Sequence, residues 1–121
     1  MAENQNINYP QCIKELLSLR DSFDTLSGKW KLPIMQYLFN RKDEFNHFRK
    51  IADGIPGISD KMLAKELTDL VHNHLICKIP SPDYPLKKGY SISQHGESTI
   101  PVIKTLVNWG KTHREVIKTL A

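Results

Sequence analysis

The sequence has few features of a secreted or membrane-bound protein. Two cysteines among 121 residues are too few for a disulfide framework, and they fit a reducing compartment. No apolar run approaches the roughly 20 residues that a membrane-spanning helix needs. The opening stretch, 1–8, is polar and has no basic start followed by an apolar segment, as a secretory signal would. We therefore expect a cytoplasmic protein without a membrane partner.

The sequence also lacks the common motifs of catalysis and metal binding. It has no glycine-rich loop for phosphates, no His-Glu zinc motif and no nucleophile elbow. His72, His74 and Cys77 are close in sequence but have no fourth ligand at a local spacing, which disfavours a zinc site. We expect no enzymatic activity, no metal and no cofactor.

A strong excess of charge is absent as well. Seventeen Lys and Arg residues against 13 Asp and Glu give a net charge of +4, a level that solubility alone explains. There is no basic tail, and the largest local excess is +3 over residues 104–121, from four Lys and Arg against one Glu. If the chain binds nucleic acid, the placement of a few cations must therefore matter more than the total charge.

The length suits a single domain, 1–121, and hydrophobic periodicity divides it into helices and one strand pair. We expect flanking helices in 1–26 and 97–121, a helix over 30–39, a helix–turn–helix over 45–73 and a wing over 75–93. Asn46 and Ser59 are the expected N-caps of the helix pair. The order predicts a mainly α fold with a small antiparallel β-hairpin, a winged helix-turn-helix whose second paired helix can enter a DNA major groove.

The helix expected after Ser59 has two unlike faces. At 100° per residue, Leu63, Leu67 and Leu70 cluster on one side, as core residues do. The nearly opposite side carries Lys61, Lys65 and Thr68. Such cations can face phosphates or guanine edges, although any solvated helix face also carries lysines. The order of elements favours DNA, because two further lysines, Lys87 and Lys88, follow in the proline-rich loop of the expected wing.

Four ordered motifs make the chain resemble the HxlR-type (MarR-like) transcriptional regulators. They are GKWKLPI at 28–34, IPGISDKML at 55–63, YSISQHG at 90–96 and PVIKTLVNWG at 101–110. The similarity covers about residues 23–110. The resemblance implies a winged-helix bacterial repressor or activator that binds double-stranded DNA as a homodimer, on a pseudo-palindromic operator.

By position, the resemblance places several residues of this chain at the DNA. Those at the start of the recognition helix are Ser59, Lys61, Met62 and Lys65; Pro82, Pro85 and Lys87 are on the wing, and Lys31 begins a supporting helix that could touch phosphate. The chain departs from the family at Leu17, where members usually carry a sensor cysteine, and at Leu86, where the wing's second proline usually stands. The nearest cysteine to the sensor position is Cys12.

The flanking helices carry more apolar residues than a small core needs, so we expect them to form a symmetric dimer interface. The expected dimerisation residues are Leu16, Leu19, Phe23, Ile103, Leu106, Trp109, Val116, Ile117 and Leu120. Alternatives to the DNA-binding regulator are a winged-helix adaptor that binds protein and a sensor variant that responds to a thiol reagent or small ligand. We expect Cys77 to be a buried, inert thiol in a strand, which counts against thiol sensing. A small hydrophobic effector between the flanking helices and the core is a further possible partner.

Overall fold

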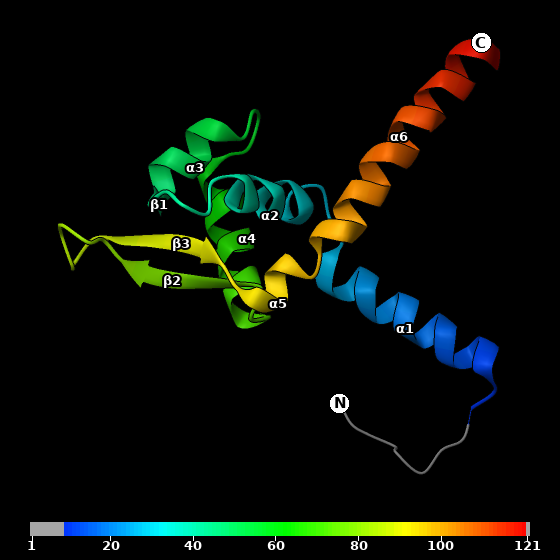
Figure 1. The fold of residues 1–121 in the computed structure, drawn as a ribbon, viewed down its shortest axis with the longest axis horizontal. Coiled ribbons are helices and arrows are strands. Elements are labelled where there is room, and N and C mark those ends of the chain that lie inside the picture. Colours follow the sequence, from blue (N-terminus) through cyan, green and yellow to red (C-terminus); the bar gives the residue numbers. More distant parts are fainter. Residues whose placement is uncertain (1–8, 121) are drawn as a thin grey trace.

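The computed structural model describes residues 9–120, whose course is shown in Figure 1. In chain order the elements are α1 (Gln11–Leu26), α2 (Lys31–Asn40), β1 (Asn46–His47), α3 (Phe48–Gly54), α4 (Asp60–His72), β2 (Ile76–Pro80), β3 (Lys88–Ile92), α5 (Gln94–Glu97) and α6 (Ile100–Leu120). The expected class is confirmed: the chain is mainly helical, with α3 and α4 as the helix pair and β2 and β3 as an antiparallel hairpin.

The sheet has one strand more than the sequence predicted. β2 pairs with β3 from Ile76 opposite Ile92 to Pro80 opposite Lys88, and the short β1 pairs with the other edge of β3. Two residues are too few to show an alternating pattern, so periodicity could not reveal β1.

The expected N-cap of α3 is wrong by one residue. Asn46 lies in β1, where its side-chain amide donates to the backbone carbonyls of Arg41 (2.9 Å) and Glu44 (3.2 Å). The cap is His47, whose Nδ1 accepts a hydrogen bond from the backbone N–H of Lys50 at 3.2 Å. Asn46 is thus used to close the turn after α2 rather than to start α3.

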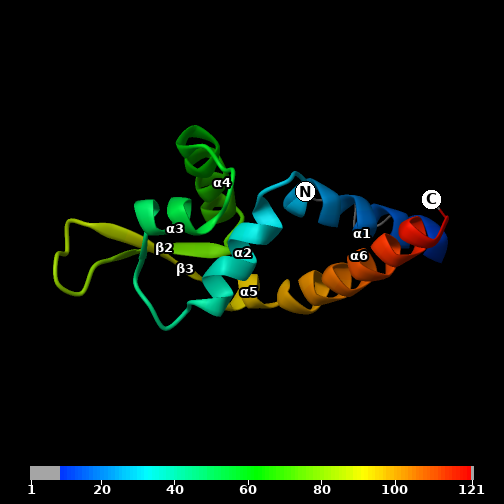
Figure 2. The ribbon, with the colours of Figure 1, turned by 90° about the horizontal axis from the view of Figure 1, so that it is seen from above.

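The core lies where α2, α3 and α4 meet the hairpin and the start of α6 (Figure 2). Its side chains include Ile34, Met35 and Leu38 of α2, Ile51 of α3, Leu63, Leu67 and Leu70 of α4, Leu75, Ile76 and Ile92 around the hairpin, and Ile100 and Ile103 of α6. The leucine stripe predicted for α4 is therefore the face that packs inward, and the opposite face is left to solvent.

The short helix α5 is packed too tightly at Gly96 to hold any side chain there. Ser93 accepts a hydrogen bond from the backbone N–H of Gly96 (2.9 Å) and donates one to the carbonyl of His74 (2.7 Å). A Cβ at Gly96 would overlap the carbonyl oxygen of Leu75 and lie 2.8 Å from Cε of Met35. The absence of a side chain at Gly96 therefore lets the base of the hairpin pack directly against α2.

We expect Gly96→Ala to lower the free energy of unfolding by about 1–3 kcal/mol, the usual cost of overpacking a core. The matched control is Gly110→Ala, because no atom lies within 4 Å of a Cβ there and the position is inside α6. That change should instead stabilise the helix, by up to about 1 kcal/mol. Urea unfolding of both variants at one protein concentration tests the pair, and equal midpoints would contradict the packing argument.

The terminal helices α1 and α6 leave the core on the side away from the hairpin tip and diverge from each other (Figure 1). α1 contributes no buried residue, and α6 contributes only Ile100 and Ile103, both near its start. Most of both helices therefore contacts nothing else in the described part of the chain.

Candidate nucleic-acid interface

The second helix of the pair, α4, presents a polar face to solvent. Ser59 caps it as predicted, accepting a hydrogen bond from the backbone N–H of Met62 at 3.1 Å. Lys61, Lys65 and Thr68 are exposed, and Met62 is half-buried beside them. The structure thus brings together on α4 and its N-cap the residues that the sequence placed at DNA in this segment: Ser59, Lys61, Met62, Lys65 and Thr68.

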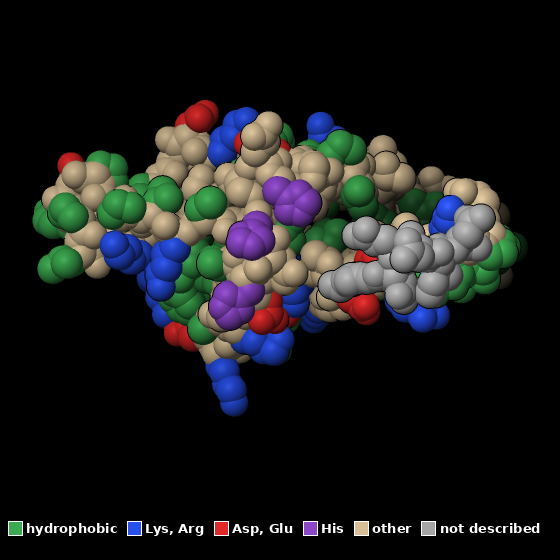
Figure 3. Space-filling view, turned by 90° about the horizontal axis from the view of Figure 1, so that it is seen from below, with side chains coloured by type: hydrophobic (Ala, Val, Ile, Leu, Met, Phe, Trp, Pro, Cys, Tyr) green, Lys and Arg blue, Asp and Glu red, His purple; other side chains and the backbone are tan. Residues whose placement is uncertain are grey.

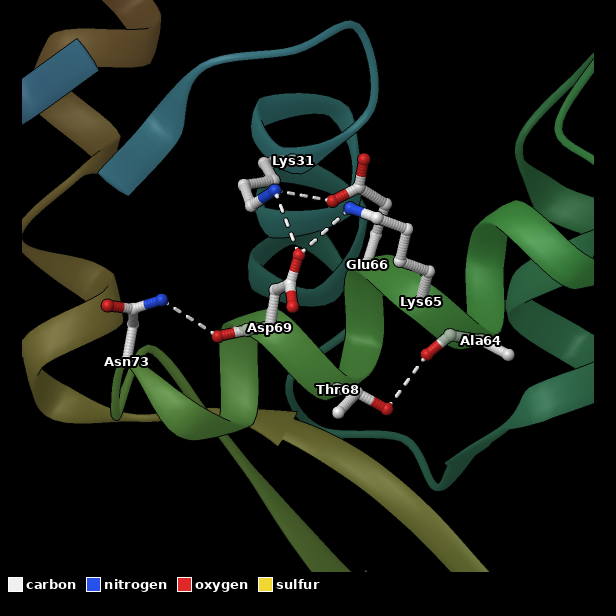
Figure 4. Close-up of polar contacts among 7 residues, drawn as sticks. All are labelled: Lys31, Ala64, Lys65, Glu66, Thr68, Asp69 and Asn73. Atoms are coloured by element: carbon white, nitrogen blue, oxygen red, sulfur yellow. Dashed lines mark hydrogen bonds and ion pairs between the residues drawn. The ribbon is translucent and has the colours of Figure 1, made fainter. Parts of the chain in front are cut away.

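Lys65 and Thr68 already have partners within the helix. Lys65 Nζ lies 3.1 Å from Oδ2 of Asp69, and the Thr68 hydroxyl donates to the carbonyl of Ala64 at 3.0 Å (Figure 4). The hydrogen bond from Lys65 lowers the pKa of Asp69 below its ordinary value, so this carboxylate stays charged. Because the Lys65 side chain is 63% exposed, exchanging Asp69 for a phosphate involves little desolvation.

Lys31 does not lie at this surface, and its predicted contact with phosphate is corrected here. Only 9% of the residue is exposed, and its Nζ lies 2.5 Å from Oε1 of Glu66 and 3.5 Å from Oδ2 of Asp69 (Figure 4). Burial alone would lower the pKa of Lys31, but the hydrogen bond and charge of Glu66 raise it above its ordinary value. Lys31 instead joins α2 to the buried side of α4 and thereby fixes how α4 is rotated.

A cation that the sequence analysis missed lies beside the start of α4. Arg49 of α3 contacts Asp60 at 2.6 Å and Asp53 at 3.8 Å, and its side chain is 55% exposed. The hydrogen bond to Asp60 raises the pKa of Arg49 further above its ordinary value. The sequence shows the i,i+4 spacing of Arg49 and Asp53. It does not show the contact with Asp60, because that contact depends on how α3 packs against the start of α4.

A concave corner lies where the hairpin meets α4. A cavity of about 210 Å³ there is lined by Leu67, Thr68, Val71, His72, Lys78 and Tyr90. The hairpin carries the loop of residues 81–87 away from the core (Figure 2). Lys87, in this loop, and Lys88, at the start of β3, are both exposed. The lysine that lines this cavity is Lys78 of β2, an exposed cation that the sequence analysis did not single out, whereas Lys61 and Lys65 of α4 are exposed outside it.

The comparisons with known proteins agree with this geometry. The model of the HxlR-like helix-turn-helix family matches residues 25–118. The chain belongs to this family. Among its relatives, the HTH-type transcriptional regulator YybR of Bacillus subtilis (strain 168) is 29% identical over 98% of this chain and 90% of its own length. YdeP, a second such regulator, is 30% identical over 94% of this chain and 87% of its own.

A solved structure shows the same fold. The crystal structure of a transcriptional regulator named ytcD matches with a TM-score of 0.69 and 26% identity, over 80% of this chain and 96% of that one. Together with the family match, this confirms the expected winged helix-turn-helix and the expected function at the level of a DNA-binding transcriptional regulator.

Both cysteines of this HxlR-like chain are exposed, so the expected burial of Cys77 is wrong. Along β2, Ile76 faces the core and Cys77 points to the opposite side of the sheet, opposite Ser91 in the register. The helices of the core pack against the face of the sheet that holds Ile76, and the face that holds Cys77 is exposed. Across residues 9–120, no group of three His, Cys, Asp or Glu side chains is placed to hold a metal ion.

The terminal helices of the HxlR-like chain hold all but one of the predicted dimerisation residues at their surface. Exposed fractions range from 46% at Val116 to 77% at Leu120, and the set includes Leu16, Leu19, Phe23, Leu106, Trp109 and Ile117. The exception is Ile103, which is 4% exposed and belongs to the core of the single chain. Among the described residues, no helix is both long and apolar enough to cross a membrane.

Proposed function

We propose that this HxlR-like chain regulates transcription as a homodimer on a pseudo-palindromic operator, with one α4 in each of two major grooves. The observation that carries the proposal is the exposed face of α4, with Lys61 and Lys65 outside and the leucine stripe buried. Two recognition helices related by a twofold axis require half-sites about 34 Å apart, or a multiple of that. The proposal includes no catalytic step and places the protein in the cytoplasm.

The terminal helices support the pairing of two copies. Each helix carries several exposed apolar side chains at helical spacing, a feature that marks protein interfaces when it is larger than a few scattered residues. Their charges are also of opposite sign: α1 has two Lys and Arg against three Asp and Glu, whereas α6 has four against one. Packing of α1 of one copy near α6 of the other would bring these charges together, which gives the positive excess of α6 a role away from DNA.

Space for a small effector exists between these helices and the core. One cavity of about 240 Å³ between α1 and α5 is lined by Asp21, Ser22, Thr25, Leu26, Leu75, His95 and Thr99. Another of about 230 Å³ between α2 and α6 is lined mainly by apolar side chains. Both are below the 300–1,000 Å³ typical of drug-sized ligand sites, so we propose that any effector held here is a small molecule of few atoms.

Selection of bound fragments from random duplex DNA, followed by anisotropy titration, tests the proposed function. We expect a recovered motif with twofold symmetry. Lys65→Ala removes one contact from each half-site, so it should raise the Kd about 30- to 2 × 10⁴-fold, since each base contact contributes about 1–3 kcal/mol. The matched control is Lys42→Ala, which removes an exposed lysine that lies near Glu97, outside α4, the wing and the terminal helices. Unchanged affinity for Lys65→Ala, or equal losses in both variants, would contradict the assignment of α4.

The wing should behave differently from α4. We expect Lys87→Ala to weaken binding to all duplexes alike and to reduce the slope of log K against log salt by about one for each wing, because a phosphate contact releases counterions without reading bases. Titrations at several salt concentrations, on the selected operator and on a scrambled duplex, measure this. A changed base preference with an unchanged slope would show that Lys87 reads bases instead.

A further inference from the structure

The tip of the wing exposes an apolar side chain almost completely. Leu86 is 96% exposed, more than any other large hydrophobic residue in the described chain, and Tyr84 beside it is 70% exposed. Figure 3 shows hydrophobic side chains gathered at this end of the hairpin, with Lys and Arg side chains next to them. Neither side chain contributes to the core, so their exposure needs another explanation.

The loop that holds Leu86 is built by its own hydrogen bonds. The backbone N–H of Ser81 donates to the carbonyl of Lys87 (2.7 Å), and the N–H of Lys87 donates to the carbonyl of Tyr84 (2.8 Å). The Ser81 hydroxyl, in a residue only 8% exposed, accepts from the N–H groups of Asp83 (3.3 Å) and Tyr84 (3.2 Å). Prolines at 82 and 85 restrict the loop further. The backbone on either side of Leu86 is therefore held by the loop's own hydrogen bonds, and its side chain extends into solvent.

The charges around Leu86 match the walls of a DNA groove. Lys87 and Lys88 follow it directly, and Lys88 Nζ donates to the carbonyl of Pro85 at 3.4 Å, which keeps this ammonium near the tip. Asp83 is the single acidic residue of the loop. A groove presents two rows of phosphates with the less polar sugar and base edges between them. An apolar side chain next to two cations is complementary to that pattern.

The length of the hairpin fits the minor groove next to the major groove occupied by α4. Five residues in each strand span about 16 Å at the usual rise. The centres of adjacent major and minor grooves are about 17 Å apart, half of the helical repeat of about 34 Å. With the base of β2 packed against α4, the tip is carried roughly one groove away.

We propose that Leu86 is an apolar wedge that enters the minor groove and partly unstacks one base step, so that the operator bends. The proposal rests on the proposed function. Apolar side chains that enter the minor groove in this way kink duplexes by about 20–90° toward the major groove. Pyrimidine–purine steps unstack most readily, so Leu86 selects TA or CA/TG steps at the position under each wing without a hydrogen bond to any base.

Resonance energy transfer across the operator tests the wedge. The probe is a 30-base-pair duplex recovered by the selection above, with a donor and an acceptor dye at its two ends, at saturating protein. We expect the wild type to increase the transfer, Leu86→Ser to lose at least half of that increase, and Leu86→Met to keep it because the side chain stays apolar. Leu86→Met is therefore the matched control, because it changes the same position without removing the apolar side chain.

A base analogue gives a second readout of the same event. 2-Aminopurine placed in turn at the steps under the wing should brighten on binding of the wild type and not of Leu86→Ser. A straight duplex with bound wild type, or a full bend with Leu86→Ser, overturns the wedge and leaves the proposed function intact. If the selection recovers no duplex that the wild type binds, both the wedge and the proposed function are overturned. If Leu86→Ser keeps the full DNA bend but no longer binds phosphatidylglycerol vesicles that the wild type binds, the tip is assigned to a membrane surface instead.

Discussion

Replacing Lys31 with methionine should lower the free energy of unfolding by about 3–5 kcal/mol, the largest effect on stability that we expect from a single side chain. The reason is Glu66, whose side chain is 6% exposed and bonds to no other side chain in residues 9–120. Without Lys31 its carboxylate would remain buried and unpaired between α2 and α4. Urea unfolding at a fixed protein concentration measures the loss.

The two partners of this ion pair should not be equivalent. Glu66→Leu leaves Lys31 with Asp69, whose Oδ2 lies 3.5 Å from its Nζ, so this change should cost less than Lys31→Met. The double variant Lys31→Met/Glu66→Leu should recover most of the loss, because replacing a whole buried pair by apolar side chains is often close to neutral. If the double variant is as unstable as Lys31→Met, the loss comes from packing and not from an unpaired charge.

The pH dependence of stability should show Lys31 at the alkaline end of the scale and Asp69, which bonds mainly to Lys65, at the acid end. The raised pKa of Lys31 means that its contribution is complete below the ordinary lysine pKa of 10.5 and disappears as the pH rises through the folded-state value. The lowered pKa of Asp69 has the opposite sign: its contribution is present above the ordinary pKa of 3.8 and is lost as the pH falls through the folded-state value. The Lys31→Met variant should therefore lose the alkaline dependence.

Local features of this chain were predictable because their causes are local. The Ser59 cap needs only a hydroxyl three residues before an N–H, and the leucine stripe of α4 needs only helical periodicity. The hairpin follows from an alternating strand and a proline-rich loop. For the same reason the exposed residues of α4 could be listed from a helical wheel alone.

The errors arise where the role of a residue depends on distant parts of the chain. Lys31 looks like any lysine at a helix start, and only the packing of α2 on α4 places Glu66, 35 positions away, against it. Ile103 belongs to the same apolar stripe as Leu106, but one turn of α6 lies against the core and the next does not. Arg49 lies beside the start of α4 through a contact across two helices. A single sequence carries no sign of any of these contacts.

Placing two carboxylates on the apolar face of α6 should abolish the homodimer and raise the Kd for the operator about 10²- to 10⁴-fold. We choose Leu106→Asp/Trp109→Asp because both side chains are exposed, at 48% and 62%, so the single chain should keep its fold. In a symmetric interface the double change buries four unpaired charges. Separated protomers then lose the effective concentration that links binding at the two half-sites.

The matched control adds the same charge to another face of the same helix. Asn108→Asp/Thr112→Asp is exposed and, at 3.6 residues per turn, lies mainly away from the apolar stripe. Sedimentation velocity at micromolar concentration should give a monomer for Leu106→Asp/Trp109→Asp and a dimer for the control, and only the former should lose the operator. A monomeric wild type would reject the pairing of terminal helices. A dimeric Leu106→Asp/Trp109→Asp variant with intact operator affinity would move the interface off α6, because a self-complementary surface cannot hold four facing carboxylates.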